Sequence, residues 1–228
     1  MDALTNALTR QGGNKPSSDG VASVAIPEAQ SLQTGVSSNC TPTGIHHWFV
    51  FRAIYNQVDK VYKVLQEKHI ETYIPMHYVQ KVKNGKKKRI LEPLLPNLVF
   101  VYTTRKQADN LVRKPSDISG YIKYYLDKTA EKEASGFHPP LTIKDAEMMN
   151  FIHATSIEND HIMMVSPEYC HYKSGDLVRV VDGDFKGVVG KVARVSGQQR
   201  VVVEIKNLCL IATAYVPSAF LEPYEGLK

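Results

Sequence analysis

Cysteine is scarce in this sequence, and the few thiols lie far apart. The 228 residues contain three cysteines, Cys40, Cys170 and Cys209, and no two of them form a CxxC pair. An odd number of widely separated cysteines indicates neither a zinc site nor a disulfide framework. We therefore expect reduced thiols and a cytoplasmic protein.

Long apolar runs are also missing. A bilayer-spanning helix needs about 18 or more consecutive apolar residues, and the sequence has no such run. The N-terminus lacks the basic and then apolar segments of a secretory signal. We therefore expect neither a membrane span nor a membrane partner. The length of 228 residues suits one or two domains.

The residue patterns of common active sites are absent too. His46 and His47 are adjacent, so on a strand they point to opposite faces. Cys170 and His171 are adjacent, but the sequence offers no third catalytic member. No GxxxxGK phosphate loop occurs, and paired carboxylates occur only in polar stretches. We expect no enzymatic activity, no cofactor and no metal.

Positive charge is unevenly distributed along the chain. The net charge is +5, and residues 45–125 hold fifteen Lys and Arg against six Asp and Glu. Such asymmetry indicates a polyanionic neighbour, although a solvated basic surface is the alternative.

Composition and periodicity divide the chain into four segments. Residues 1–44 are rich in Ser, Thr, Gly, Asn and Gln and predict a disordered arm. Residues 45–155 mix strand and helix patterns, residues 156–172 are expected to link two domains, and residues 173–228 hold about five short strands. The predicted fold class is α+β.

The segment 45–155 contains recognisable helix-cap and turn signals. Asn56 is expected to cap a helix with apolar positions 58, 61, 62 and 65, and Thr103 or Thr104 to cap a helix over 105–113. Thr142 and Asp145 have the spacing of a capping box. Asn84-Gly85 predicts a type I′ turn in a hairpin. In the apolar strand 98–102, Leu98 and Phe100 share one face, whereas Val99 and Val101 share the other.

The C-terminal segment carries the most informative pattern. In Gly175–Val195, two valine-rich runs flank a glycine-rich turn, in which Gly187 is expected to supply a positive φ. Residues 200–205 and 208–212 are expected to pair as a hairpin around Lys206-Asn207, and Phe220-Leu221 to close a small barrel. Gly175–Val195 resembles the KOW motif of transcription factors and ribosomal proteins.

Together with three further motifs, this pattern resembles NusG-type transcription factors. The motifs are Trp48-Phe49-Val50, the stretch 95–101 and the stretch 140–147, in the family's order. The Glu-Pro-Leu-x-Pro-Asn form at 92–97 and the long polar arm resemble specialised paralogues of the UpxY and RfaH kind. Housekeeping NusG usually has Gly where Asn97 stands. The resemblance implies an NGN domain over 45–155 and a small SH3-like all-β KOW barrel over 173–228.

The resemblance also implies an apolar pocket that docks on the clamp helices of RNA polymerase. The matching positions are Trp48, Leu95, Pro96, Leu98 and Phe100; the alternative is that all five are core residues. The family's jaw-contact motif has no match at Ala108-Asp109-Asn110. A ribosomal protein is an expected partner of the KOW domain, and the chain is expected to be a monomer.

A second expected surface would contact the DNA or nascent RNA of the elongation complex. Phosphate contacts give salt-dependent affinity without sequence information. The alternative for the basic hairpin is a solvated turn that protects a sheet edge. The expected residues are Lys60, Lys63, Lys86, Lys87, Lys88, Arg89, Arg113 and Lys114.

These expectations define three candidate functions. The first is an antitermination factor that suppresses pausing or termination by RNA polymerase on one operon of the capsular polysaccharide type. The second is a housekeeping factor that couples elongation to termination or translation. The third is a KOW-containing RNA-binding, ribosome-associated protein.

Overall fold

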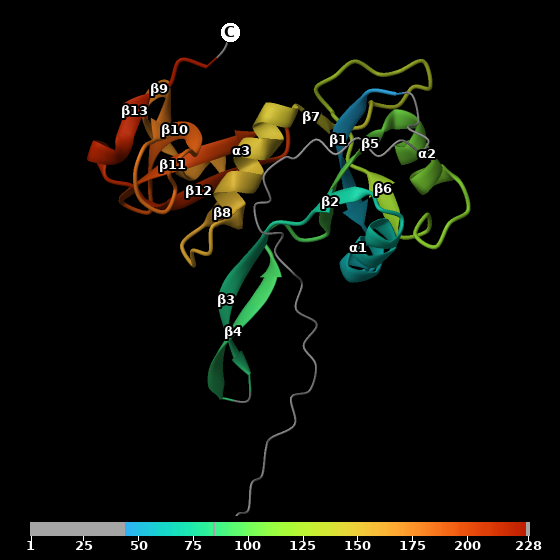
Figure 1. The fold of residues 1–228 in the computed structure, drawn as a ribbon, viewed down its shortest axis with the longest axis horizontal. Helices are drawn as coiled ribbons and strands as arrows, with labels where there is room; N and C mark the ends of the chain where they lie inside the picture. The colour runs from blue at the N-terminus through green and yellow to red at the C-terminus, as the bar shows by residue number, and fades with distance from the viewer. Residues whose placement is uncertain (1–43, 84, 227–228) are drawn as a thin grey trace, which may run out of the picture. The chain divides into compact units, whose positions relative to one another are not determined.

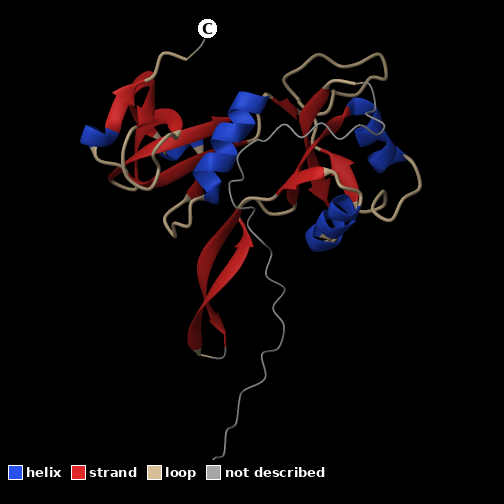
Figure 2. Ribbon diagram, viewed as in Figure 1, coloured by secondary structure: helices blue, strands red, loops and turns tan. Residues whose placement is uncertain are grey.

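Antiparallel sheets and three α-helices make up the ordered part of the chain, which confirms the predicted α+β class (Figure 2). The computed structural model describes residues 44–83 and 85–226, except for the side chains of residues 173–176. These residues belong to one compact unit, residues 38–228. The predicted N-terminal arm lies outside the described residues, apart from Gly44.

The first sheet contains the N-terminal strands. Its order is β2-β5-β1-β6, with β7 also pairing with β1 (Figure 1). All its pairings are antiparallel. Because β1 is central, its apolar residues Trp48–Phe51 and Ala53 are buried on both faces of the sheet. The strands are β1 (His46–Ala53), β2 (Glu71–Tyr73), β5 (Leu98–Thr104), β6 (Ile122–Tyr124) and β7 (Thr142–Ile143).

Helices cover both faces of this sheet. The helices α1 (Val58–Glu67) and α2 (Arg105–Arg113) pack on the face that carries Phe49, Phe51 and Val99. The helix α3 (Asp145–Ser156) packs on the opposite face, where its Phe151 ring lies 5.4 Å from that of Phe100. The predicted division of β5 into two faces is therefore confirmed, but neither face is left uncovered.

One of the three predicted helix caps forms. Thr104 caps α2 and makes a capping box with Gln107. The prediction for Asn56 is wrong, because Asn56 has a φ of 54° within a turn and α1 begins after Gln57. The Thr142 and Asp145 box is also absent, because Thr142 belongs to β7 and Lys144 precedes α3 without a side-chain cap.

The second sheet contains the C-terminal strands in the order β13-β9-β10-β11-β12-β8. The predicted hairpin around Lys206-Asn207 is confirmed as β11 and β12, and the predicted closing strand is β13. The strand β8 lies within the segment 156–172. The strands are β8 (Met163–Val165), β9 (His171–Val180), β10 (Val189–Val195), β11 (Gln198–Ile205), β12 (Cys209–Tyr215) and β13 (Leu221–Pro223). Two short 3-10 helices are η1 (Pro167–Tyr169) and η2 (Ser218–Phe220).

Two glycines fix the backbone of the second sheet. Gly187 has a φ of 93°, which confirms the predicted role in backbone geometry. At Gly190, an added Cβ would lie 2.4 Å from the carbonyl oxygen of Val202, so the strands β10 and β11 approach too closely for any side chain.

The third sheet is a hairpin of two strands, β3 (Met76–Lys83) and β4 (Lys86–Pro93) (Figure 1). Every described residue from Gln80 to Arg89 is exposed. The predicted type I′ turn falls partly on Asn84, which lies outside the described residues; its partner Gly85 has a φ of 72°.

Candidate functional site

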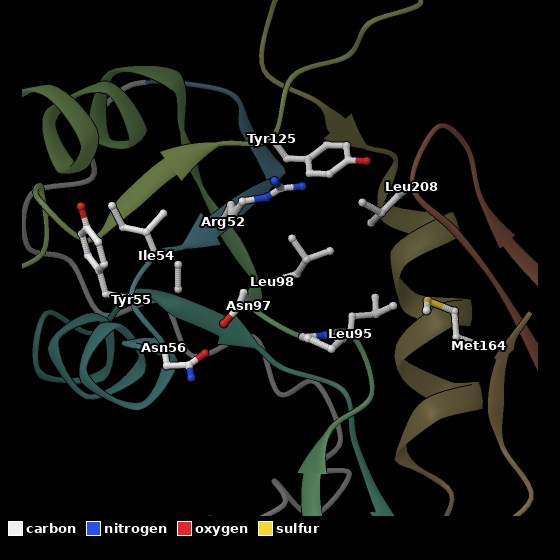
Figure 3. A pocket seen from close by; sticks show the side chains of 12 residues that line it. Arg52, Ile54, Tyr55, Asn56, Leu95, Asn97, Leu98, Tyr125, Met164 and Leu208 are labelled. Atoms are coloured by element: carbon white, nitrogen blue, oxygen red, sulfur yellow. The ribbon is translucent and has the colours of Figure 1, made fainter.

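An open groove lies where the turn between β4 and β5 approaches the second sheet. Its volume is about 670 Å³. Figure 3 shows Leu95 and Leu98 on one side and Leu208 and Met164 on the other. The groove is lined by Arg52, Ala53, Ile54, Tyr55, Asn56, Leu95, Pro96, Asn97, Leu98, Tyr125, Met164 and Leu208.

The turn at Leu95–Leu98 shapes one wall of the groove. Asn97 adopts a φ of 62°, and the amide of Leu98 donates to the carbonyl of Leu95 at 3.3 Å. The amide of Ala53 donates to the Asn97 carbonyl at 2.8 Å, which ties the turn to the end of β1. Pro96 is consequently exposed, and Leu98 is half-buried.

The five predicted pocket residues fall into two groups. Trp48, Leu95 and Phe100 belong to the core, with exposed fractions of 3%, 3% and 0%. Pro96 and Leu98 are more exposed and line the groove, as the buried Leu95 also does. The alternative that these positions are core residues therefore describes three of the five, and Pro96 and Leu98 are the more accessible to a partner in the groove.

Sequence reasoning missed the residues that complete the groove. The guanidinium carbon of Arg52 lies 5.6 Å from the centre of the Tyr125 ring, and both residues line the groove. A signal for Arg52 was available, because it is a charged residue directly after the apolar run Trp48–Phe51. Met164 and Leu208 gave no comparable signal, because they come from segments far along the chain.

Hydrogen bonds hold the wall that carries Leu208. The neighbouring Asn207 side chain donates to Thr129 Oγ1 at 2.9 Å and to Asp127 Oδ1 at 3.2 Å. The amide of Lys206 donates to Glu147 Oε1 at 2.9 Å. The turn between β11 and β12 is therefore fixed both to the 127–140 loop and to α3.

The helix α3 is also bonded to the second sheet. The Asn150 side chain donates to the Val189 carbonyl at 2.7 Å and accepts from the Val189 amide at 2.9 Å. The ring of His153 lies 2.9 Å, through Nε2, from the carbonyl oxygen of Lys186. The buried α3 residues Met148 and Phe151 belong to one apolar cluster together with Val188 and Val201. These contacts explain why α3 has no purely polar face.

The predicted basic residues lie on three separate elements. Lys86, Lys87, Lys88 and Arg89 lie on β4, Lys60 and Lys63 on α1, and Arg113 and Lys114 at the end of α2. All eight are exposed. Some have intramolecular partners: Lys60 lies 4.1 Å from the centre of the Tyr121 ring, and Arg113 pairs with Asp109 at 3.6 Å.

Two groups with strongly raised pKa values, Cys209 and Tyr124, are sequence neighbours of groove residues but do not line the groove. Burial, and then the charge of Glu147, raises the pKa of Cys209 to about 12. Burial, and then the hydrogen bond to Asp109, raises the pKa of Tyr124 above its usual range. Both shifts favour the neutral form, so neither group is a nucleophile at neutral pH.

The described residues contain neither a metal-ligand cluster nor a membrane-spanning helix. There, no three His, Cys, Asp or Glu side chains gather as a metal ion would require. No helix in this part of the chain has the length and apolar character to cross a membrane.

Comparison with known families gives two matches. Residues 46–152 match the family model described as transcription termination factor NusG, and residues 174–204 match the KOW motif. A comparison with curated proteins gave no match.

The structure and the two matches agree on an α+β domain of the NusG type at residues 46–152, followed by a KOW motif at residues 174–204. They support a NusG-type factor of transcription elongation or termination. NusG and KOW domains belong to non-enzymatic families, and NusG-family domains imply interaction with RNA polymerase and nucleic acid in general.

Proposed function

We propose that this protein binds RNA polymerase through the groove and suppresses pausing or termination on one operon of the capsular polysaccharide type. The observation that carries the proposal is the NusG match at 46–152, followed in the same chain by the KOW match at 174–204. The action would be mechanical, because a bound factor stabilises the polymerase state for which it has the higher affinity.

The assignment to a specialised paralogue of the UpxY and RfaH kind is part of this proposal. Its support is the Glu-Pro-Leu-x-Pro-Asn form at 92–97. The positive φ of Asn97 gives this form a physical reason, because Asn and Gly are the residues that tolerate such a conformation.

The five predicted clamp-contact residues are proposed to act in two ways, some by direct contact and the others by supporting the wall of the groove. Pro96 and Leu98 would touch the polymerase directly, because they are the more exposed of the predicted residues that line the groove. Trp48, Leu95 and Phe100 would hold the wall behind them, because they are buried. Leu208 and Met164 form the opposite wall, so a polymerase helix entering the groove would contact both sheets or displace the second.

Leu98→Asp tests the groove. A carboxylate there would have to lose water against an apolar partner, so binding to RNA polymerase core enzyme should fall at least tenfold. Phe100→Asp is a poorer test, because a charge at a fully buried position would unfold the domain.

Leu177→Asp is the matched control for Leu98→Asp. Leu177 is also a strand leucine, is 40% exposed and lies outside the groove on β9. Its variant should bind polymerase as the parent does. If Leu98→Asp binds as tightly as Leu177→Asp in a pull-down or by surface plasmon resonance, the groove is not the polymerase site.

The nucleic-acid contact is proposed for the exposed cations of β4, α1 and α2. Its support is their exposure and the positive charge of this half of the chain. Phosphate contacts would strengthen the hold on the elongation complex without selecting a sequence.

Operon specificity requires a separate experiment. Genome-wide mapping of polymerase occupancy, with and without the protein, should show a change at one operon. A change across all transcription units would instead assign the protein a housekeeping role.

A further inference from the structure

The register of the β3–β4 hairpin divides its cations between two faces. Directly opposed residues on antiparallel strands point to the same face, and neighbours along a strand point to opposite faces. Lys83 pairs with Lys86, and Lys81 pairs with Lys88. These four lysines therefore share one face, called here the lysine face. Lys87 lies on the other face.

The face of Lys87 has a different chemistry. Lys87 is opposed by Val82, whose exposed fraction is 70%. Arg89 on the same face is already engaged: it bonds to Asp160 at 2.6 Å and stacks over the Tyr78 ring at 3.7 Å. The run Lys86–Arg89 is therefore not one uniform basic patch.

The lysine face keeps its charges unneutralised at the outer end. Lys81 pairs with Glu92 near the base of the hairpin. Lys83, Lys86 and Lys88 form no ion pair with any residue that the structure describes. Like charges directly opposed across two strands destabilise a sheet, and here two such pairs follow one another. A polyanion bound to this face would relieve the repulsion.

The chemistry of the face favours duplex DNA over a single strand. Proteins that bind single strands combine cations with aromatic rings on which bases stack. The outer part of the lysine face presents only lysines. In a duplex the bases are already stacked, and the phosphates are the accessible groups.

We propose that the hairpin binds the phosphate backbone of duplex DNA through Lys83, Lys86 and Lys88 alone, and that Lys87 and Arg89 take no part. This inference refines the nucleic-acid contact of the proposed function and rests on it. It assigns opposite behaviour to Lys87 and Lys88, which are neighbours of the same residue type and are both exposed.

The test compares Lys88→Gln with Lys87→Gln in the full-length protein. Binding to a short fluorescein-labelled duplex of mixed sequence is followed by anisotropy between about 50 and about 200 mM salt. Each lost phosphate contact lowers the slope of log K against log salt by about 0.9. Lys88→Gln should show this decrease in slope. The triple variant, with Gln at Lys83, Lys86 and Lys88, should show a decrease about three times as large. Lys87→Gln should keep the slope of the parent.

Four outcomes would overturn the inference. Equal decreases for Lys87→Gln and Lys88→Gln would show that the faces are not distinguished. An unchanged slope for the triple variant would show that the hairpin does not bind phosphates. Self-association of that variant with an unchanged slope would show that the lysines instead prevent the sheet edges from pairing with another molecule. Tighter binding of the parent to the single strand than to the duplex would show that duplex DNA is not the preferred ligand.

Polymerase binding separates this inference from the proposed function. The triple variant should still bind RNA polymerase core enzyme, because the groove lies on other elements. If its DNA slope is unchanged while the parent binds polymerase, only the hairpin inference is wrong. If the parent fails to bind polymerase, the proposed function is wrong, whatever the slopes are.

Discussion

Asn97 has a φ of 62° in the turn where β4 leads into β5. This left-handed conformation costs little for Asn or Gly and roughly 1–2 kcal/mol for other L-residues. Because Asn97 also accepts the hydrogen bond from Ala53 through its carbonyl, the turn cannot relax without releasing the end of β1. One residue thus sets the position of Pro96 and Leu98 in the groove.

Asn97→Val should lower the free energy of unfolding by about 1–2 kcal/mol, because a β-branched side chain opposes the positive φ. Asn97→Gly is the control and should stay within about 0.5 kcal/mol of the parent, since Gly adopts this conformation freely. Urea denaturation of the three proteins measures the difference. A Val variant as stable as the Gly variant would contradict the left-handed turn.

Residue-level prediction from the sequence succeeded where the cause is local. Thr104 and Gln107 lie within one helical turn, and their capping box forms as expected. Asn56 and Thr142 have the same chemical capacity to cap, but a turn and a strand pairing decide their backbone conformations. The pairing of Thr142 with Phe49 spans a long separation in the chain, so a short motif could not reveal it.

At the scale of the element, the β3–β4 hairpin carries charge at the expense of its own stability. Its outer residues are exposed and have no apolar core beneath them. The sequence indicates a basic hairpin, but a count of cations does not show which of them share a face. The alternation of side chains along a strand was an available signal that would have separated Lys87 from Lys88.

Lys86→Glu should stabilise the hairpin, because it places opposite charges across from each other at Lys83 and residue 86. The expected gain is about 0.2–1 kcal/mol in local opening, measured by hydrogen exchange of the hairpin amides. Lys87→Glu is the control and should give no such gain, because residue 87 faces Val82. Slower exchange in both variants would contradict the observed register.

At the scale of the whole molecule, one apolar cluster connects the first sheet to the second through α3. Trp48 and Phe100 belong to it together with Val180 and Val203. The sequence predicted apolar faces on each strand but not which surface covers them. Residues such as Met164 and Leu208 reach the groove only through the packing of distant segments, so the groove's second wall could not be predicted.

Alkaline pH should destabilise the folded unit. The pKa of Cys209 is about 12 in the folded protein against an ordinary value of 9. Between these values the unfolded chain loses this proton while the folded chain retains it, so stability falls as pH rises. The contribution is fully present below about pH 9 and is lost progressively between about pH 9 and about pH 12.

Cys209→Ala isolates this effect. Its unfolding free energy should depend less steeply on pH over that range than the parent's, as measured by urea denaturation at several pH values. Lysine and tyrosine titration affects both proteins alike and cancels in the comparison. Identical pH slopes would show that Cys209 titrates normally in the folded protein.

The hairpin described above is a separate sheet, which continues into the rest of the chain at the base of β3 and β4 and contacts it through the pairing of Arg89 with Asp160. Eight residues per strand, at about 3.3 Å each, make it roughly 26 Å long. Opposed residues can be added or removed in pairs without changing the register of any other strand. The length of the hairpin can therefore change independently of the rest of the fold. A longer or shorter hairpin would change how far the protein reaches along a polyanion, while the groove would stay the same.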